Sequence, residues 1–265
     1  MNVACALRHS LFLQELVVIP ILTPFFPGPL APLGEALALS PTAPPGALPV
    51  LRLINDAAVL KAALVAHARW LDYDGNDLRA VASAWSMAYL GALLPPYCAA
   101  ASVLEHVFPA AAGQLSVSLD AHGTPSTFHL HSAGHVLPHG SAWERYRPLL
   151  QDHLPMLFAA LTACSRIPPK ILWGNVARHL HVIFDNATQQ LPSVTRIETD
   201  RAQLLESADG DHGPNPLHDR QRCVRLVEDG RIASRVMYRQ CCLYVLLPPG
   251  LYCQGCPLDP AQRSG

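Results

Sequence analysis

Four cysteines lie within sixteen residues of the segment RQCCLYVLLPPGLYCQGCPL. They are Cys241, Cys242, Cys253 and Cys256, and their pattern is C-C-x10-C-x2-C. Thiols at this density are typical of disulfide exchange, zinc binding or iron–sulfur ligation. The spacing within the pattern bears on which of these three chemistries the segment supports.

Disulfide exchange and zinc binding both fit this spacing poorly. Adjacent cysteines pair only through a strained ring, and the CQGC pair lacks the helix that follows a redox C-x-x-C site, because Pro257 and Pro260 intervene. A structural zinc site with four cysteines normally uses two C-x-x-C-like knuckles, and Cys241-Cys242 is not one. A redox disulfide and a four-cysteine zinc site remain as alternatives.

An iron–sulfur cluster makes a different demand on the chain. A [2Fe–2S] cluster has two irons that each take two thiolates, so its four ligands need not converge on one point. Adjacent cysteines on a strand point to opposite faces, so the backbone must bend at Cys241-Cys242 for both to bind. Pro248-Pro249-Gly250 can turn the chain back, and Gly255 lets the backbone close tightly around sulfur. We therefore expect the four sulfurs to come together.

Histidines supply a second group of candidate ligands but complete no known motif. His129 and His131 would share a face of a strand, and His135 and His139 follow closely. No Cys, Asp or Glu completes a set at recognisable spacing, so we interpret them as incidental residues on a solvated hairpin face. The sequence also lacks the G-x-S-x-G, P-loop and G-x-G-x-x-G motifs, which leaves hydrolase, P-loop and Rossmann functions without support.

The composition is that of a chain with a full hydrophobic core. Hydrophobic residues make up 50% of the 265 residues, charged residues 15%, and the net charge is −1. This charge balance gives no support to nucleic-acid binding. The four cysteines outside the cluster are interpreted as buried small apolar residues in a reducing compartment; they are Cys5, Cys98, Cys164 and Cys223.

Residues 11–33 are very apolar and follow Arg8, as in a secretory signal. Glu15 interrupts the run, no clean cleavage site follows, and several prolines prevent a helix long enough to span a bilayer. These prolines are Pro20, Pro24, Pro27, Pro29 and Pro32. We expect an extended, proline-rich arm packed across the domain surface.

The elements that must position the cysteines are mostly helical. We expect a helix over 56–75, with Asp56 as N-cap and Gly75 as stop, and more helix over 76–108 with a break at Pro95-Pro96. Further helices are expected over 141–167 and 170–188. Trp85, Tyr89 and Leu93 recur at helical spacing and predict one buried face.

Period-two alternation predicts the strands. Residues 114–131 indicate a β-hairpin, and residues 222–239 indicate two strands joined at Asp229-Gly230. The sum is an α+β fold with a mostly helical body, a β-hairpin and a small C-terminal iron–sulfur module. We expect a body over residues 1–211 and a module over residues 212–265.

The chain resembles the siderophore-iron reductases of the FhuF type. C-C-x10-C-x2-C is similar to the terminal signature of that family. Four other segments are also similar to it, namely TPFFPGPLAPLGEAL (23–37), SAWSMAYLGALLPPYCAA (83–100), WGNVA (173–177) and GPNPL (213–217). The similarity covers most of the chain but not the first ten residues.

The resemblance implies an oxidoreductase, a ferric-siderophore reductase that reduces siderophore-bound Fe(III) in one-electron steps. It implies a [2Fe–2S] cluster held by Cys241, Cys242, Cys253 and Cys256, with no catalytic side chain beyond the cluster. It further implies a bacterial cytoplasmic protein in peripheral contact with the inner membrane, a siderophore substrate of the hydroxamate type, and an electron donor that the sequence does not identify.

Two other functions remain open. The chain is alternatively a siderophore- or partner-binding protein with a structural zinc site, or a ferredoxin-like electron carrier. Trp143 and Trp173 are candidates for a siderophore pocket or are ordinary core or rim residues. Arg235 and Arg239 are candidates for tuning the cluster or are exposed strand arginines, which ordinary surface composition favours.

Overall fold

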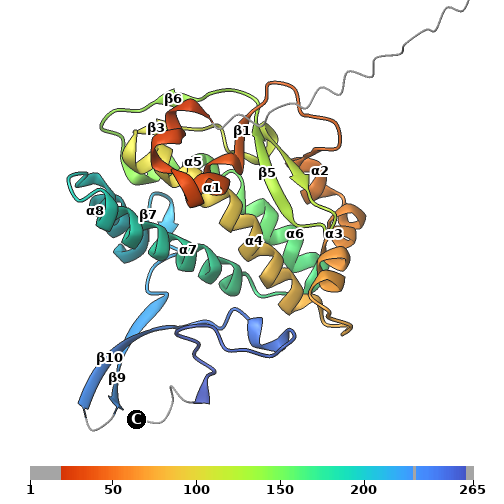
Figure 1. Ribbon diagram of the computed structural model, residues 1–265, viewed down its shortest axis with the longest axis vertical. Coiled ribbons are helices and arrows are strands. Elements are labelled where there is room, and N and C mark those ends of the chain that lie inside the picture. Colours follow the sequence, from red (N-terminus) through yellow and green to blue (C-terminus); the bar gives the residue numbers. More distant parts are fainter. Residues whose placement is uncertain (1–18, 229–230, 261–265) are drawn as a thin grey trace, which may run out of the picture.

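Helix α4, Leu78–Cys98, runs through the middle of the protein (Figure 1). The computed structural model describes residues 19–228 and 231–260. Trp85, Tyr89 and Leu93 are fully buried along α4, as their helical spacing predicts. The hydrophobic core is therefore built around this helix.

The predicted break at Pro95-Pro96 is wrong, because α4 continues through both prolines. The fixed prolyl φ is compatible with a helix, and each proline removes only one backbone donor. Burial compensates for this loss: Leu94 and Tyr97 are almost wholly buried, and the Tyr97 hydroxyl donates a hydrogen bond to the carbonyl oxygen of Arg145 at 2.9 Å. Tertiary packing has overridden the local signal.

Other helices of the body pack on α4 or on the helices next to it. They are α2 (Val50–Asn55), α3 (Ala57–Trp70), α5 (Ala142–Leu150), α6 (Leu154–Ser165) and α7 (Pro169–Gln190). Asp56 caps α3 as predicted, since its carboxylate accepts hydrogen bonds from the amides of Ala58 and Val59. The helix ends at Trp70, before the predicted stop at Gly75.

The predicted helix over 141–167 is in fact two helices, α5 and α6. His153 lies between them with φ −128° and ψ −68°, outside the helical region. Its ring is turned into the core, where Nε2 lies 2.6 Å from the Tyr89 hydroxyl and Nδ1 lies 2.8 Å from the carbonyl oxygen of Ala110. These two buried bonds hold the chain at the corner.

The hairpin predicted over 114–131 is confirmed by β4 (Leu115–Leu119) and β5 (Pro125–Leu130). It forms the centre of a four-stranded sheet with the order β1-β5-β4-β2. The outer strands are very short, β1 (Leu37–Leu39) parallel to β5 and β2 (Leu48–Pro49) antiparallel to β4. Strands of this length leave little alternation to detect.

Short elements connect these parts. They are η1 (Pro20–Phe25), η2 (Gly28–Leu30), α1 (Ala31–Glu35), η3 (Ala99–Val103), β3 (His106–Val107), η4 (Ala112–Gln114), β6 (His135–Val136), α8 (Arg196–Arg201), η5 (Ala202–Glu206), β7 (Asp209–Gly210) and β8 (Gly213–Pro214). The arm expected over 11–33 is not extended where the structure describes it, because Pro20–Phe25 form a 3₁₀ helix that buries Leu22. Residues 1–18 lie outside the described part.

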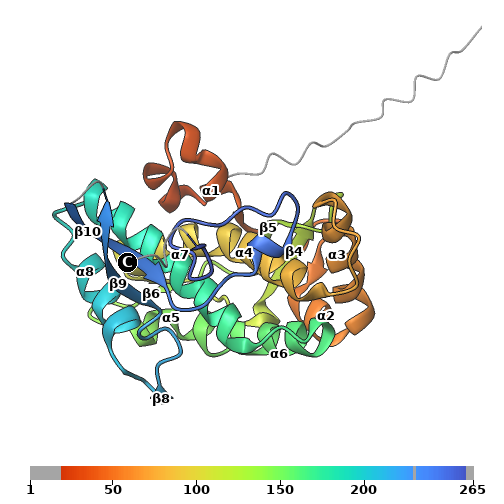
Figure 2. The same ribbon diagram turned by 90° about the horizontal axis from the view of Figure 1, so that it is seen from below.

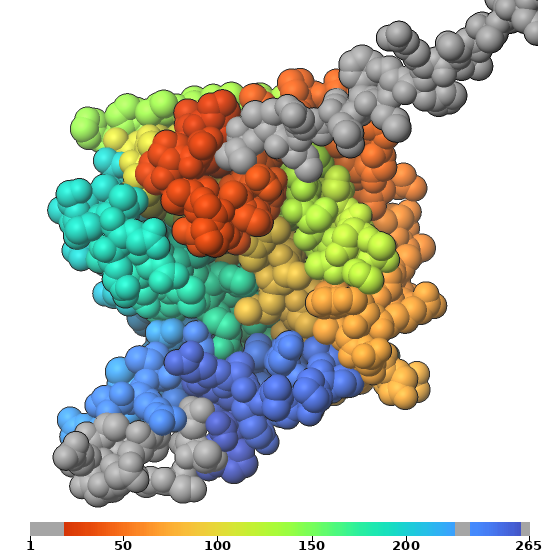
Figure 3. All heavy atoms as spheres, in the orientation of Figure 1, coloured from red at the N-terminus to blue at the C-terminus, as the bar shows by residue number. Residues whose placement is uncertain are grey.

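The C-terminal segment begins with a two-stranded ribbon, β9 (Gln221–Glu228) and β10 (Arg231–Tyr238), which confirms the predicted strand pair. The predicted turn at Asp229-Gly230 lies outside the described residues. The chain then crosses α7 and α4 (Figure 2), with η6 (Tyr244–Leu246) against α4. Figure 3 shows this segment packed along the lower face of the helical body.

The structure is α+β, as predicted, with long helices and small sheets. No helix in the described ranges is both long enough and apolar enough to cross a membrane.

Candidate metal centre

The four clustered cysteines approach one another in two pairs. The sulfur atoms of Cys242 and Cys253 are 3.6 Å apart, and those of Cys241 and Cys256 are 4.0 Å apart. Cys242 and Cys256 are buried, while Cys241 and Cys253 are half-buried. Each pair joins one residue of the adjacent C-C sequence to one of the C-x-x-C sequence.

The backbone bend after the adjacent pair falls at Leu243. This residue has φ +63°, a left-handed conformation that a leucine rarely adopts. The bend turns the Leu243 amide back, so that it donates a hydrogen bond to the Cys241 sulfur at 3.3 Å. Further along, the Gly250 amide bonds to the Leu247 carbonyl at 2.7 Å, closing the turn that brings the C-x-x-C residues back.

Gly255 is required within the C-x-x-C turn. Its φ is +71°, and a Cβ placed there would lie 2.9 Å from the carbonyl oxygen of Val236. The Gly255 carbonyl accepts a hydrogen bond from the Tyr238 amide at 2.9 Å. The turn is thus held tightly against the end of β10.

Gln240, which precedes Cys241, fastens the segment to the body. Its side-chain oxygen accepts a hydrogen bond from Arg220 at 3.3 Å, and its backbone carbonyl accepts one from Arg178 at 3.4 Å. A Cβ at Gly174 of α7 would lie 3.6 Å from the Gln240 Cβ, which is van der Waals contact. Helix α7 therefore supports the cysteine site directly.

Arg178 of α7 reaches one of the four sulfurs. One terminal nitrogen of its guanidinium lies 3.8 Å from the Cys253 sulfur. The guanidinium also stacks on the Tyr238 ring, 3.4 Å from the ring centroid. The sequence analysis did not single out Arg178. The sequence feature that could have identified it is an arginine one turn after Gly174 and Asn175, on the apolar face of a helix.

The thiols influence one another's ionisation. Hydrogen bonds with Cys241 and Cys253 lower the pKa of Cys242, and the positive charge of Arg178 lowers it further. The bond to Cys242 raises the pKa of Cys241 and of Cys253. The arrangement thus favours a thiolate first at Cys242, and thiolate is the form that binds metals.

The two sulfur pairs have the spacing of ligands on a metal. A tetrahedral metal with thiolate bonds of about 2.3 Å separates two of its sulfurs by about 3.8 Å, close to both measured distances. In the described residues, no group of three or more Cys, His, Asp or Glu side chains converges as metal ligands, so the four sulfurs come together in pairs only. Two thiolates for each metal is the donor set that the two irons of a [2Fe–2S] group take, and a tetrahedral zinc ion has the same spacing between its sulfurs.

The histidine hairpin differs from the solvated face that we expected. His129 is buried, and its ring lies within hydrogen-bond distance of the Ser40 and Ser118 hydroxyls, at 3.3 and 2.8 Å. His131 lies 3.1 Å from the Ser116 hydroxyl. Strand β1 covers this part of β5, which explains the burial. His135 and His139 are exposed.

The remaining cysteines and the strand arginines give mixed outcomes. Cys98 is buried as expected, but Cys164 is half-buried and Cys223 is exposed on β9, so the interpretation as core residues is wrong for Cys223. Cys5 lies outside the described residues. Arg235 and Arg239 are exposed, as surface composition favours, and Arg239 pairs with Asp219 at 2.8 Å.

Trp143 of α5 and Trp173 of α7 line one cavity of about 350 Å³. Its other walls include Leu150 and Pro155, and the loop residues Asp211, His212, Gly213, Pro214, Pro216 and Leu217. Trp173 directly precedes Gly174, which contacts Gln240 beside the cysteines. Helix α7 therefore contributes both to this cavity and to the support of the cysteine segment.

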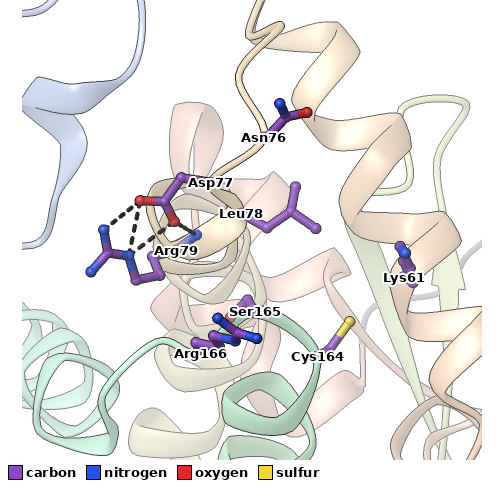
Figure 4. Close-up of a pocket in the computed structure, with 8 residues that line it drawn as sticks. All are labelled: Lys61, Asn76, Asp77, Leu78, Arg79, Cys164, Ser165 and Arg166. Atoms are coloured by element: carbon purple, nitrogen blue, oxygen red, sulfur yellow. Dashed lines mark hydrogen bonds and ion pairs between the residues drawn. The ribbon is translucent and has the colours of Figure 1, made fainter.

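A larger, more polar cavity of about 610 Å³ lies at the start of α4 (Figure 4). Lys61, Arg79 and Arg166 line it, together with Asp77, Cys164 and Ser165. Asp77 is already engaged, because its carboxylate accepts hydrogen bonds from the Arg79 amide and guanidinium. None of the four clustered cysteines lines this cavity.

Two solved structures are similar in fold. One is ATP-bound aerobactin synthetase IucA from a hypervirulent pathotype of Klebsiella pneumoniae, with a TM-score of 0.50 and 19% identity over 64% of this chain and 36% of that chain. The other is aerobactin synthetase IucA from the same source, with a TM-score of 0.50 and 18% identity over 65% and 37% of the two chains. The chain thus spans little more than a third of these synthetases, and the likeness is one of fold alone.

A search of the curated proteins finds no match. A family model described as "Ferric iron reductase FhuF-like transporter" matches residues 83–233, which are more than half of the chain. The matched region includes most of α4, all of α7 and Arg178, while the four clustered cysteines follow it. The chain belongs to the FhuF-like ferric iron reductase family.

Proposed function

We propose that this protein is a ferric-siderophore reductase whose [2Fe–2S] cluster is held by Cys241, Cys242, Cys253 and Cys256. The observation that carries the proposal is the approach of the four sulfurs in two pairs, at 3.6 and 4.0 Å. In this proposal residues 212–265 act as a cluster-binding module on a reductase domain formed by residues 1–211. Membership of the ferric iron reductase family supports the assignment.

A [2Fe–2S] cluster supplies one electron at a time, and one electron converts Fe(III), which oxygen donors grip strongly, into the softer Fe(II), which they hold weakly. No nucleophile or general base is needed for this change. The task of the chain is therefore to bind the cluster and the ferric substrate, to orient them and to shield them from water. Cys242 and Cys256 provide buried thiolate positions, and Gln240 and Gly255 fix the backbone on either side.

The substrate in this proposal is a siderophore-bound Fe(III) of the hydroxamate type that docks in the cavity between Trp143 and Trp173. The size of the cavity, about 350 Å³, suits part of a small molecule. Its two indole rings offer flat apolar surface, and Asp211 and His212 add polar groups. Helix α7 supplies Trp173 to the cavity and Gly174 to the support of Gln240, which favours this cavity over one on another helix.

Spectroscopy tests the cluster. Protein purified without oxygen should be red-brown, and dithionite should produce the paramagnetic signal of a one-electron-reduced [2Fe–2S] centre. Cys242→Ser and Cys256→Ser should lose both features, whereas Cys223→Ser, on the exposed face of β9, should keep them. Colourless protein with stoichiometric zinc would instead support a binding protein with a zinc site.

Anaerobic mixing tests the reaction. The reduced protein should be reoxidised by ferric hydroxamate siderophores, with release of Fe(II) to a chelator. A reduced cluster that stays reduced in their presence would favour a ferredoxin-like electron carrier that serves another protein.

Fluorescence tests the cavity. A ferric siderophore should quench tryptophan emission, and Trp143→Phe and Trp173→Leu should each weaken binding about tenfold, as expected for loss of an aromatic contact. Trp70→Phe is the control, because Trp70 is exposed and does not line the cavity. Unchanged affinity in both cavity variants would place the substrate elsewhere.

A further inference from the structure

Among the described residues two arginines are buried, and only one of these two has a carboxylate partner. Arg145 is 1% exposed and pairs with the carboxylate of Asp200 at 2.5 Å. Arg178 is 8% exposed, and no carboxylate of the described residues lies within ion-pair distance of its guanidinium. A buried cation without an anion is costly, so the partner of Arg178 calls for an explanation.

The polar and ring contacts of the Arg178 guanidinium lie at the end of β10 and in the cysteine segment that follows it. They are the Cys253 sulfur at 3.8 Å, the Gln240 carbonyl at 3.4 Å and the Tyr238 ring at 3.4 Å from its centroid. The Nε–H group of Arg178 is buried and has no hydrogen-bond partner in the described structure. A neutral carbonyl and a ring do not neutralise a guanidinium, whereas thiolate sulfur does.

We infer that Arg178 is a positioning residue that provides the positive charge opposite the cysteine site and raises its reduction potential. The inference rests on the proposed function. A four-thiolate [2Fe–2S] centre is anionic when oxidised and gains a further negative charge on reduction. A fixed cation beside Cys253 stabilises the more negative state more strongly, which favours reduction.

The other nearby cations do not take this role. Arg220 donates to the Pro216 carbonyl at 2.7 Å and to the Gln240 side chain, not to sulfur. Arg239 is exposed and pairs with Asp219. Arg220 therefore serves as a matched control, because it also holds Gln240 yet has no contact with a cysteine.

The test is a spectroelectrochemical titration of the iron-loaded protein. Arg178→Gln removes the positive charge but keeps a side chain that can form hydrogen bonds. We expect the equilibrium constant for reduction to fall about tenfold, which lowers the potential of a one-electron couple by about 59 mV. Arg178→Lys keeps the charge and should stay closer to the wild type. Arg220→Gln should keep the wild-type potential.

The outcomes separate this inference from the proposed function. A wild-type protein that binds no cluster contradicts the proposed function itself. A loaded Arg178→Gln protein with an unchanged potential contradicts the role of Arg178 alone. If the Arg178→Gln protein binds no cluster, the Arg178→Lys protein provides the test. An Arg178→Lys protein that binds the cluster with a potential near that of the wild type supports charge compensation. Failure of both variants with unchanged helical circular dichroism assigns Arg178 only to holding the segment and overturns the inference.

Discussion

The side-chain amide of Asn175 donates a hydrogen bond to the Ser86 hydroxyl at 2.9 Å and thereby joins α7 to α4. It also lies 3.0 Å from the Ser83 hydroxyl, and all three residues are buried. Asn175 and the two serines belong to the WGNVA and SAWSMAYL segments, so the family-like segments meet in the core. This contact fixes the helix that supports the cysteine site.

Asn175→Ala should destabilise the fold. The change leaves buried serine hydroxyls with fewer partners, which should cost about 1–3 kcal/mol and lower Tm by several degrees. Thermal unfolding followed by circular dichroism measures the loss. Asn186→Ala, at an exposed position of the same helix, should keep the wild-type Tm. Equal Tm values for the two variants would contradict the role given to Asn175.

Gly255→Ala should impair metal retention more than Gly250→Ala. Both glycines have positive φ, +71° and +80°, so an alanine is strained at either position. Only at Gly255 does the added Cβ meet a backbone atom, the Val236 carbonyl at 2.9 Å, whereas at Gly250 the nearest contact is at 3.8 Å. Iron per chain after anaerobic purification is the measurement. Full iron content in Gly255→Ala would show that the turn tolerates a shift.

Stability should fall in acid because of His153. Burial lowers the pKa of His153 from 6.5 to about 4, so the unfolded state takes up the proton first as the pH drops. The stability that depends on a neutral His153 is fully present above pH 6.5 and is lost progressively as the pH falls toward 4. Between pH 7 and pH 5 the loss is about 2 kcal/mol.

Urea unfolding at the two pH values measures this effect. His153→Gln removes the titrating ring, so its loss between pH 7 and pH 5 should be smaller than that of the wild type by about 2 kcal/mol. His122→Gln changes an exposed histidine and should keep the wild-type dependence. A wild-type slope in His153→Gln would assign the acid sensitivity to other groups.

Asp200→Asn should be far more damaging than Asp77→Asn. Loss of the Asp200 charge leaves buried Arg145 without its counter-ion, which should cost about 3–5 kcal/mol and lower Tm by roughly 10 °C. The Asp77–Arg79 pair, drawn in Figure 4, has both side chains exposed, and asparagine also caps helices well, so Asp77→Asn should change Tm little. Comparable Tm losses in both variants would contradict this contrast.

Local sequence patterns correctly predicted the elements that are determined by residues close to one another in the chain. The buried face of Trp85, Tyr89 and Leu93, the Asp56 cap and the two strand pairs follow from periodicity and turn chemistry. The continuity of α4 through Pro95-Pro96 does not, because packing of residues such as Tyr97 outweighs the lost backbone bonds. The sheet position of β1 also depends on a distant partner.

For the candidate site too, some features could be predicted from the sequence and others depend on the fold. The spacing of the cysteines indicates metal chemistry, because residue type and separation are local facts. The pairing of Cys241 with Cys256 and of Cys242 with Cys253 depends on how the chain folds back after Leu243. The approach of Arg178 depends on how α7 packs under the segment, and no spacing within the sequence encodes a contact across 75 residues.

The guanidinium of Arg178 is held between the Tyr238 ring, the Gln240 carbonyl and the Cys253 sulfur, on a helix whose neighbouring side chains are in the core. A charge confined in this way does not have to reorient when the charge on the sulfur beside it changes. Water would have to do so, and its reorientation would add to the activation barrier. For the proposed one-electron centre, a cation held on α7 in this way would lower the reorganisation energy and so speed electron transfer as well as favour it.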